Sequence, residues 1–142
     1  MDVIEITPAR AAIVDAVCLM VVIDEVLDPE EYSFLTVMLM TMFELDEDVS
    51  VALLENSLGR LDGAEAETFI EAVIDRIGTD DEKFALLVGL YMASMADGKV
   101  LQAELGLLEH FILRLKMAEA QVRAAEVQAV NLYTQATTVY EA

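Results

Sequence analysis

Two carboxylate pairs with the same spacing are the residues of this sequence with the clearest potential for chemistry. Glu104 follows Asp97 by seven residues, and Glu31 follows Asp24 at the same interval. Each Asp ends an apolar stretch of helical character, and each Glu falls in the first turn of the next predicted helix. The spacing predicts two helix corners with two carboxylates each. Carboxylate oxygens are ligands for hard divalent cations such as Ca²⁺.

The segment 97–104 copies the second half of an EF-hand calcium loop, which has an Asp, an invariant Gly, an apolar residue and a final bidentate Glu. The two earlier loop positions that must supply oxygen ligands are apolar here, and they are apolar in the segment 24–31 as well. This excludes a complete EF-hand and leaves a weak calcium-type site as an interpretation. The predicted ligands are Asp97 and Glu104 at one corner, and Asp24, Glu31 and the additional carboxylate Asp28 at the other.

A structural role explains the same residues without a metal. Gly98 can end one helix in the left-handed conformation, and Glu104 can accept backbone N–H groups at the start of the next. Asp97, however, falls at a helix C-terminus, where an anion is unfavourable unless a cation or a donor compensates it. Lys99 or a divalent cation can do so, and both interpretations stay open.

The elements that position these corners are all predicted to be helices. Capping signals recur along the chain, apolar residues recur at helical spacing, and strand patterns are absent. The signals are Thr7-Pro8, Asp28-Pro29-Glu30-Glu31 and Thr79-Asp80-Asp81-Glu82. Seven helices are predicted, over residues of about 8–24, 29–42, 46–59, 65–77, 80–96, 102–116 and 118–139.

The echo of one corner in the other predicts a duplication. The expected fold is all-α, a single domain over residues 1–142, with two pseudo-repeated helical hairpins packed as a bundle. The near-continuous apolar run 84–96 predicts the most buried helix, with Gly98 as its C-cap. On the following helix the residues predicted to be buried are Leu105, Leu108, Phe111, Ile112 and Leu115.

The composition indicates an apolar, Met-rich core. Hydrophobic residues make up 56% of the chain, which has eight Met and no Trp despite a formal charge of −19. Met38, Met40 and Met92 lie in apolar helical runs and are predicted to be core residues, although a Met-lined groove for a partner helix is an alternative. Cys18, the single cysteine, is predicted to pack as a small hydrophobe.

Acidic residues dominate the first hairpin. No Lys or Arg occurs between Arg10 and Arg60, and a strongly negative surface is predicted there. Such a surface disfavours nucleic acid and anionic lipid and favours a cation or a basic protein partner, although a merely solvated face explains most of the charges equally well. The carboxylates of this interval are Asp15, Asp24, Glu25, Asp28, Glu30, Glu31, Glu44, Asp46, Glu47, Asp48 and Glu55.

No targeting or membrane signal is evident. The N-terminal residues Asp2 and Glu5 stand where a secretory signal has basic residues, and the longest apolar run has 13 residues, too few to span a bilayer. The sequence therefore predicts a soluble, cytoplasmic domain without direct membrane insertion.

A catalytic function has little support in the sequence. His110 is the only histidine, it is expected at the surface or its boundary, and no nucleophile and base pair is evident. Ferritin-like di-iron sites need two Glu-x-x-His motifs, which a single histidine cannot supply. No phosphate-binding glycine pattern occurs either. We therefore expect a protein that is not an enzyme.

The sequence resembles the TerB-like family of tellurite-resistance proteins and, through it, the N-terminal domain of DnaJ-type co-chaperones. The residues that carry the resemblance are Ala96-Asp97-Gly98-Lys99-Val100, Glu104, Leu108 and the pair Asp24 and Glu31. The resemblance implies an all-helical, non-catalytic module of a stress-response system. It also implies divalent metal at the acidic corners, with Asp97 and Glu104 as ligands and, more weakly, Asp24 and Glu31. The sequence departs from the family pattern at Glu25 and Leu101.

Three functions follow from these observations. The first is an acidic interaction module that docks onto a basic protein surface or a stress-response complex. The second is a dedicated divalent-cation binder of the calcium type, and the third is a self-associating scaffold that forms a homodimer through an apolar groove.

Overall fold

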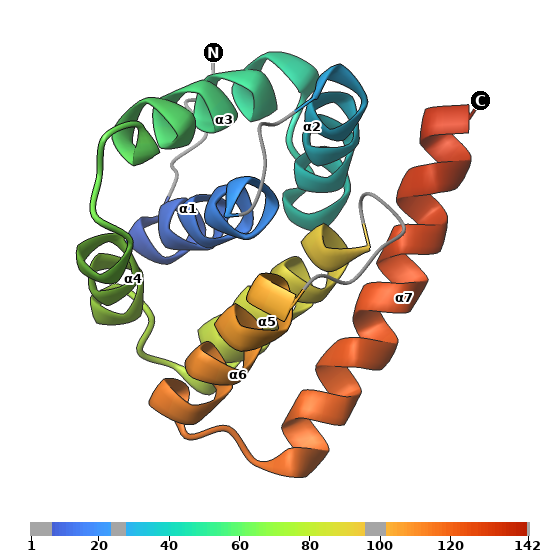
Figure 1. The fold of residues 1–142 in the computed structure, drawn as a ribbon. Helices are drawn as coiled ribbons and strands as arrows, with labels where there is room; N and C mark the ends of the chain where they lie inside the picture. Colours follow the sequence, from blue (N-terminus) through green and yellow to red (C-terminus); the bar gives the residue numbers. More distant parts are fainter. Residues whose placement is uncertain (1–6, 24–27, 96–101, 142) are drawn as a thin grey trace.

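Seven α-helices account for nearly all of the chain that is described, and no strand occurs among these residues (Figure 1). The computed structural model describes residues 7–23, 28–95 and 102–141, with side chains through residue 137. The predicted all-α class is confirmed. The helices are α1 (Pro8–Val22), α2 (Pro29–Phe43), α3 (Glu47–Leu61), α4 (Ala66–Asp75), α5 (Asp80–Ser94), α6 (Gln102–Leu115) and α7 (Glu119–Glu141).

The predicted capping signals begin three of these helices. The Thr7 hydroxyl accepts the Arg10 N–H at 3.1 Å before Pro8. Thr79 and Glu82 form a complete capping box at the start of α5. Asp28 does the same with Glu31 at the start of α2. Because each cap satisfies N–H groups that lack an intrahelical partner, the starts are fixed by local chemistry.

The core is centred on α1 and α5, which pack directly against each other. Both helices are apolar around most of their circumference, which is expected of helices surrounded by others. Gly89 of α5 permits their close approach. A Cβ atom built there lies 3.1 Å from Val17 Cγ2 and 3.3 Å from Ile13 Cγ2, closer than ordinary packing allows.

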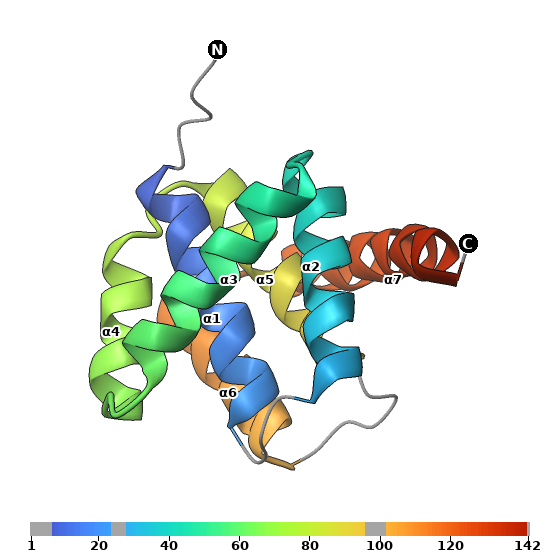
Figure 2. The ribbon, with the colours of Figure 1, turned by 90° about the horizontal axis from the view of Figure 1, so that it is seen from above.

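The remaining helices cover this pair. Seen from above, α3 crosses over α1 and α4 lies beside it (Figure 2). On the other side α7 packs against α5 and α2, with Ala125, Ala129 and Ala136 fully buried. The rings of Phe34 and Tyr133 also meet there, with centroids 5.5 Å apart. None of the described helices combines the length and hydrophobicity that a membrane crossing needs.

The predicted packing as two hairpins is not confirmed. α5 and α6 do pack together, but α1 packs mainly against α5 and α3, whereas α2 packs mainly against α7 and α3. The end of α5 also differs from the prediction, because the helix stops at Ser94 with Met95 as its C-cap. Gly98, the predicted C-cap, lies outside the described residues.

The prediction that Leu105 of α6 is a core residue is wrong. Leu105 is 44% exposed, while Leu107, Leu108, Phe111 and Leu115 are buried. The buried face of α6 is therefore turned towards Leu107, which places Leu105 at its edge. Met38 and Met92 are fully buried as predicted, but Met40 is only half-buried.

Candidate functional site

At the first corner, the described carboxylates are engaged in helix capping. Asp28 Oδ1 accepts the Glu31 N–H at 2.8 Å, and Glu31 Oε1 accepts the Asp28 N–H at 3.5 Å. Glu31 is only 7% exposed, so it is a buried acid rather than part of a surface charge. The capping interpretation of Asp28 and Glu31 is confirmed. Asp24, the other predicted ligand, lies outside the described residues.

At the second corner, Glu104 lies in the first turn of α6 and is 4% exposed. It is a polar side chain with a partner, like Glu31. Asp97, its predicted companion, lies outside the described residues. The two corners belong to helices, α2 and α6, that are not a closely packed pair.

Within residues 7–23, 28–95 and 102–137, no three His, Cys, Asp or Glu side chains are grouped so that they could hold a metal ion. Because each predicted site also requires an Asp outside these residues, divalent-cation binding at Asp24, Glu31, Asp97 and Glu104 stays a prediction.

Seven carboxylates of the acidic interval predicted from the sequence are exposed on or next to α2 and α3. None of them forms an ion pair with a described Lys or Arg. The group, called the acidic face below, consists of Asp28, Glu30, Glu44, Asp46, Glu47, Asp48 and Glu55. Part of its charge has a local role, since Asp46 caps α3 by accepting the Val49 N–H at 2.9 Å.

A shallow apolar groove runs between α2 and α3 within this acidic face. It encloses about 300 Å³. Its lining residues are Tyr32, Ser33, Thr36, Val37, Met40, Glu47 and Val51. Tyr32, Val37, Met40 and Val51 are half-buried, so their apolar surface is partly open to solvent. Glu47 lies at one end of the groove and Glu55 meets Tyr32 at the other.

The Tyr32–Glu55 contact joins the two helices across the groove. The Tyr32 hydroxyl donates a hydrogen bond of 2.6 Å to Glu55 Oε1. This hydrogen bond to a carboxylate, followed by burial, raises the pKa of Tyr32 from 10.0 to about 12. The phenol therefore keeps its proton, and Glu55 is held at the edge of the groove.

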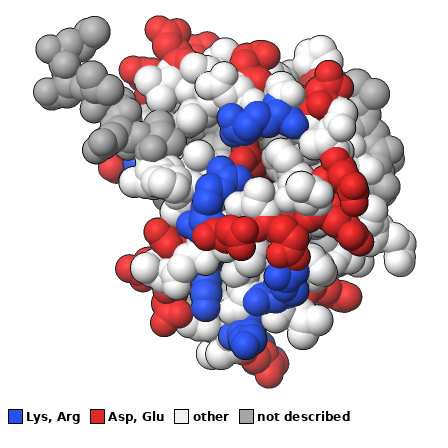
Figure 3. Space-filling view, turned by 90° about the vertical axis from the view of Figure 1, so that its left-hand side faces the viewer, with Lys and Arg blue, Asp and Glu red and all other residues white. Residues whose placement is uncertain are grey.

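Unlike the carboxylates of the acidic face, the arginines near α4 and α7 are paired with residues of opposite charge. Arg114 pairs with Glu71 through both of its Nη atoms, and Arg123 pairs with Glu119 at 2.6 Å. Figure 3, a view from the α4 side, shows Lys and Arg side chains interspersed with Asp and Glu. On this side the positive charges are offset locally, so they give no basic surface of the kind that binds nucleic acid.

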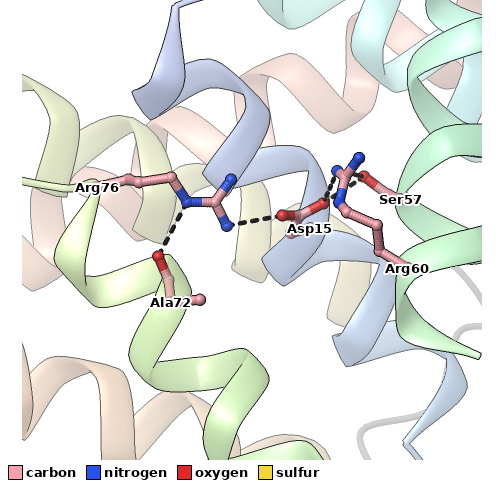
Figure 4. A network of polar contacts seen from close by, with 5 residues as sticks. All are labelled: Asp15, Ser57, Arg60, Ala72 and Arg76. Atoms are coloured by element: carbon pink, nitrogen blue, oxygen red, sulfur yellow. Dashed lines mark hydrogen bonds and ion pairs between the residues drawn. The ribbon is translucent and has the colours of Figure 1, made fainter. Parts of the chain in front are cut away.

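A buried charge cluster holds α1, α3 and the end of α4 together (Figure 4). Asp15 is 1% exposed, and its Oδ1 accepts hydrogen bonds from Ser57 Oγ and Arg60 Nη2, both at 2.5 Å. Its Oδ2 accepts one from Arg76 Nη2 at 2.7 Å. Arg76 Nε in turn donates to the Ala72 carbonyl at 2.9 Å. Three donors thus satisfy the hydrogen-bonding needs of a carboxylate in the core.

Sequence reasoning missed this cluster, because it counted Asp15 among the surface acids of the first hairpin. The placement as a surface residue is wrong. The available signal was its position, since Asp15 is the one charge within the apolar stretch 11–23. A lone acid inside an otherwise apolar helix is rarely exposed to water and needs a buried partner.

The only cysteine and the only histidine of the chain lie in opposite environments. Cys18 is fully buried as predicted, and burial, reinforced by the charge of Asp15, raises the pKa of its thiol to about 12. The thiol is therefore neutral and inert near pH 7. His110 is exposed as predicted, and its ring meets the edge of Phe111 at a centroid distance of 6.4 Å.

Comparison with known proteins found no family model, no curated protein and no solved structure that matches this chain. The resemblance to the TerB-like family therefore rests on the short motifs quoted above.

Proposed function

We propose that this protein is a non-catalytic interaction module whose α2–α3 pair docks a basic, amphipathic helix of a partner protein. The observation that carries the proposal is the apolar groove between α2 and α3, with carboxylates at both ends and no described Lys or Arg paired to them. An amphipathic helix places apolar side chains in such a groove and its Lys or Arg residues over the acidic rim.

The length of the groove suits about two turns of such a helix. Its lining on α2 runs from Tyr32 to Met40, which at about 1.5 Å per residue is about 12 Å. Met40 contributes a flexible, polarizable side chain that adapts to different apolar partners. A second copy of this chain is disfavoured as the occupant, since its own charge of −19 repels the acidic face.

The resemblance to the TerB-like family implies a stress-response system, and we propose a complex of such a system as the setting. A basic membrane-associated protein fits the same chemistry. Neither the toxicant nor the pathway enters the proposal, which concerns the docking of a basic helix alone.

The test uses a synthetic Leu–Lys amphipathic peptide of about 15 residues, with fluorescence anisotropy as the readout. We expect the double variant Glu47→Gln/Glu55→Gln to weaken binding about 5- to 10-fold, since each exposed charge pair contributes up to about 1 kcal/mol. Binding by the wild-type protein should also weaken as salt is raised, because the rim charges are exposed.

The matched control is Glu65→Gln/Glu67→Gln, which removes the same charge from exposed positions at the start of α4. It should change the affinity by less than twofold. If both double variants weaken binding equally, net charge alone attracts the peptide and the groove is not its site. Far-UV circular dichroism of both variants checks that each keeps its helix content.

A further inference from the structure

A second hollow, separate from the acidic face, lies where α1 begins, α2 ends and α5 begins, with α7 along one side. It encloses about 360 Å³, within the range of about 300–1,000 Å³ typical of small-molecule sites. Its apolar lining consists of Ala9, Ile13, Met42, Phe43, Phe84, Ala85, Val88 and Leu132. Its polar lining consists of Thr7, Arg10, Asp81, Glu82 and Gln128.

Arg10 is the distinctive residue of this hollow. Its guanidinium carbon lies 5.3 Å from the centre of the Phe43 ring, the geometry of a cation–π contact. The four other arginines, Arg60, Arg76, Arg114 and Arg123, pair with carboxylates, whereas Arg10 makes no ion pair with any described residue. In a chain with a charge of −19, an arginine that pairs with no described acid and lies at the edge of an apolar hollow has donors available for an anion.

The two acids of the lining differ in how far they oppose an anion. Glu82 Oε1 already accepts the N–H groups of Gly78 and Thr79, at 2.9 and 3.0 Å, and these bonds lower its pKa. Its charge is therefore offset by donors and by the N-terminus of α5. Asp81 is exposed and shows no hydrogen bond of this kind among the described residues, so of the two carboxylates it should repel an anion more strongly.

Helix ends add little net charge to the hollow. The N-terminus of α5 already offsets Glu82, and the partial positive charge at the start of α1 faces a partial negative charge at the end of α2. The attraction of an anionic group therefore depends on Arg10.

We infer that this hollow binds a small amphiphile with one carboxylate and a medium-length apolar chain. The carboxylate pairs with the Arg10 guanidinium, for which a planar, two-oxygen anion is the best geometric match. The apolar chain lies against Phe84, Val88 and Leu132, where its burial drives binding. The inference is independent of the proposed function, since the two sites share no lining residue.

The experiment compares three probes of equal chain length on the full chain by isothermal titration calorimetry: decanoate, 1-decanol and decyltrimethylammonium. We expect decanoate to bind at least fivefold more tightly than 1-decanol, and the cation to bind most weakly. Arg10→Gln should remove the preference for decanoate and leave 1-decanol binding unchanged, which also shows that the hollow is intact. Asp81→Asn should tighten decanoate binding.

Arg123→Gln is the matched control, because it removes one positive charge from an exposed position on α7. It should leave decanoate binding unchanged. A preference for the cation, equal loss of decanoate binding in both arginine variants, or no binding of any probe would each overturn the inference. Retention on phosphatidylglycerol vesicles without decanoate binding would do so as well, because it would make a lipid surface the anion.

Discussion

The acidic face of α2 and α3 and the region where α1, α3 and α4 meet use charge in opposite ways. In the second region one carboxylate, Asp15, is buried and receives donors from Ser57, Arg60 and Arg76. On the acidic face seven carboxylates are exposed, and none pairs with a described Lys or Arg. Charge therefore holds helices together around Asp15 and is left available to solvent or a partner on the acidic face.

This difference follows from where the few basic residues lie in the sequence. The chain has eight Lys and Arg against 27 Asp and Glu, and none of the eight falls between residues 10 and 60. The arginines at the ends of α3 and α4 reach Asp15 because those helices pack against α1. No such residue exists within α2 or the body of α3, so their packing depends on apolar contacts and capping instead.

The largest effect is expected at the buried carboxylate. Asp15→Asn should lower the free energy of unfolding by about 2–3 kcal/mol, because it leaves two arginines and a buried serine with a neutral acceptor. Arg60 and Arg76 keep partial access to water, which limits the loss. Urea denaturation at pH 7 measures the change.

Glu119→Gln provides the contrast, because its ion pair with Arg123 is exposed on both sides. It should leave the urea midpoint unchanged. Equal destabilisation by both substitutions would mean that the buried cluster contributes no more than a surface pair, and the comparison between the two regions would fail.

The second effect concerns the Tyr32–Glu55 hydrogen bond of the acidic face. Tyr32→Phe should cost about 1 kcal/mol at pH 7. The pKa of Tyr32 is about 12 in the folded protein and 10.0 as its ordinary value, so the folded state holds the proton more tightly. The advantage of the wild type is then fully present below pH 10 and is lost as the pH rises towards 12.

Urea denaturation of both proteins between pH 8 and about 12 tests this. Ionisation of Cys18, which has a similarly raised pKa, destabilises both proteins, and its charge adds only the smallest of the contributions that raise the pKa of Tyr32. A difference that stays constant over this range would show that the hydrogen bond does not depend on the phenol proton.

Helix starts could be predicted from the sequence because their causes are local. Thr7-Pro8, the Asp28–Glu31 box and the Thr79–Glu82 box each involve residues within one turn, and all three begin helices in the structure. The all-α class followed from the same signals. Helix ends were less predictable, as α5 shows by stopping at Ser94, because an apolar run carries no local stop signal.

What the sequence could not supply depends on how the helices pack. Leu105 fits the apolar period of α6 but lies at the edge of its buried face, because α6 packs against α5, α1 and α4. Asp15 is buried because α3 and α4 bring arginines to it. The acidic run was visible in the sequence, whereas the groove within it needs the contact between α2 and α3.

The smallest effect compares two helix ends with the same backbone and opposite charge. Glu44 after α2 and Lys116 after α6 both adopt the left-handed conformation, with φ of 54° and 55°. Glycine has no steric cost there, so either substitution should stabilise the fold by up to about 1 kcal/mol.

Glu44→Gly also removes an anion from a negative helix end, whereas Lys116→Gly removes a favourable cation. Thermal denaturation should therefore rank Glu44→Gly above Lys116→Gly, and the gap should shrink as salt screens the charges. The opposite ranking would mean that the negative charge of the acidic face carries no cost to the fold.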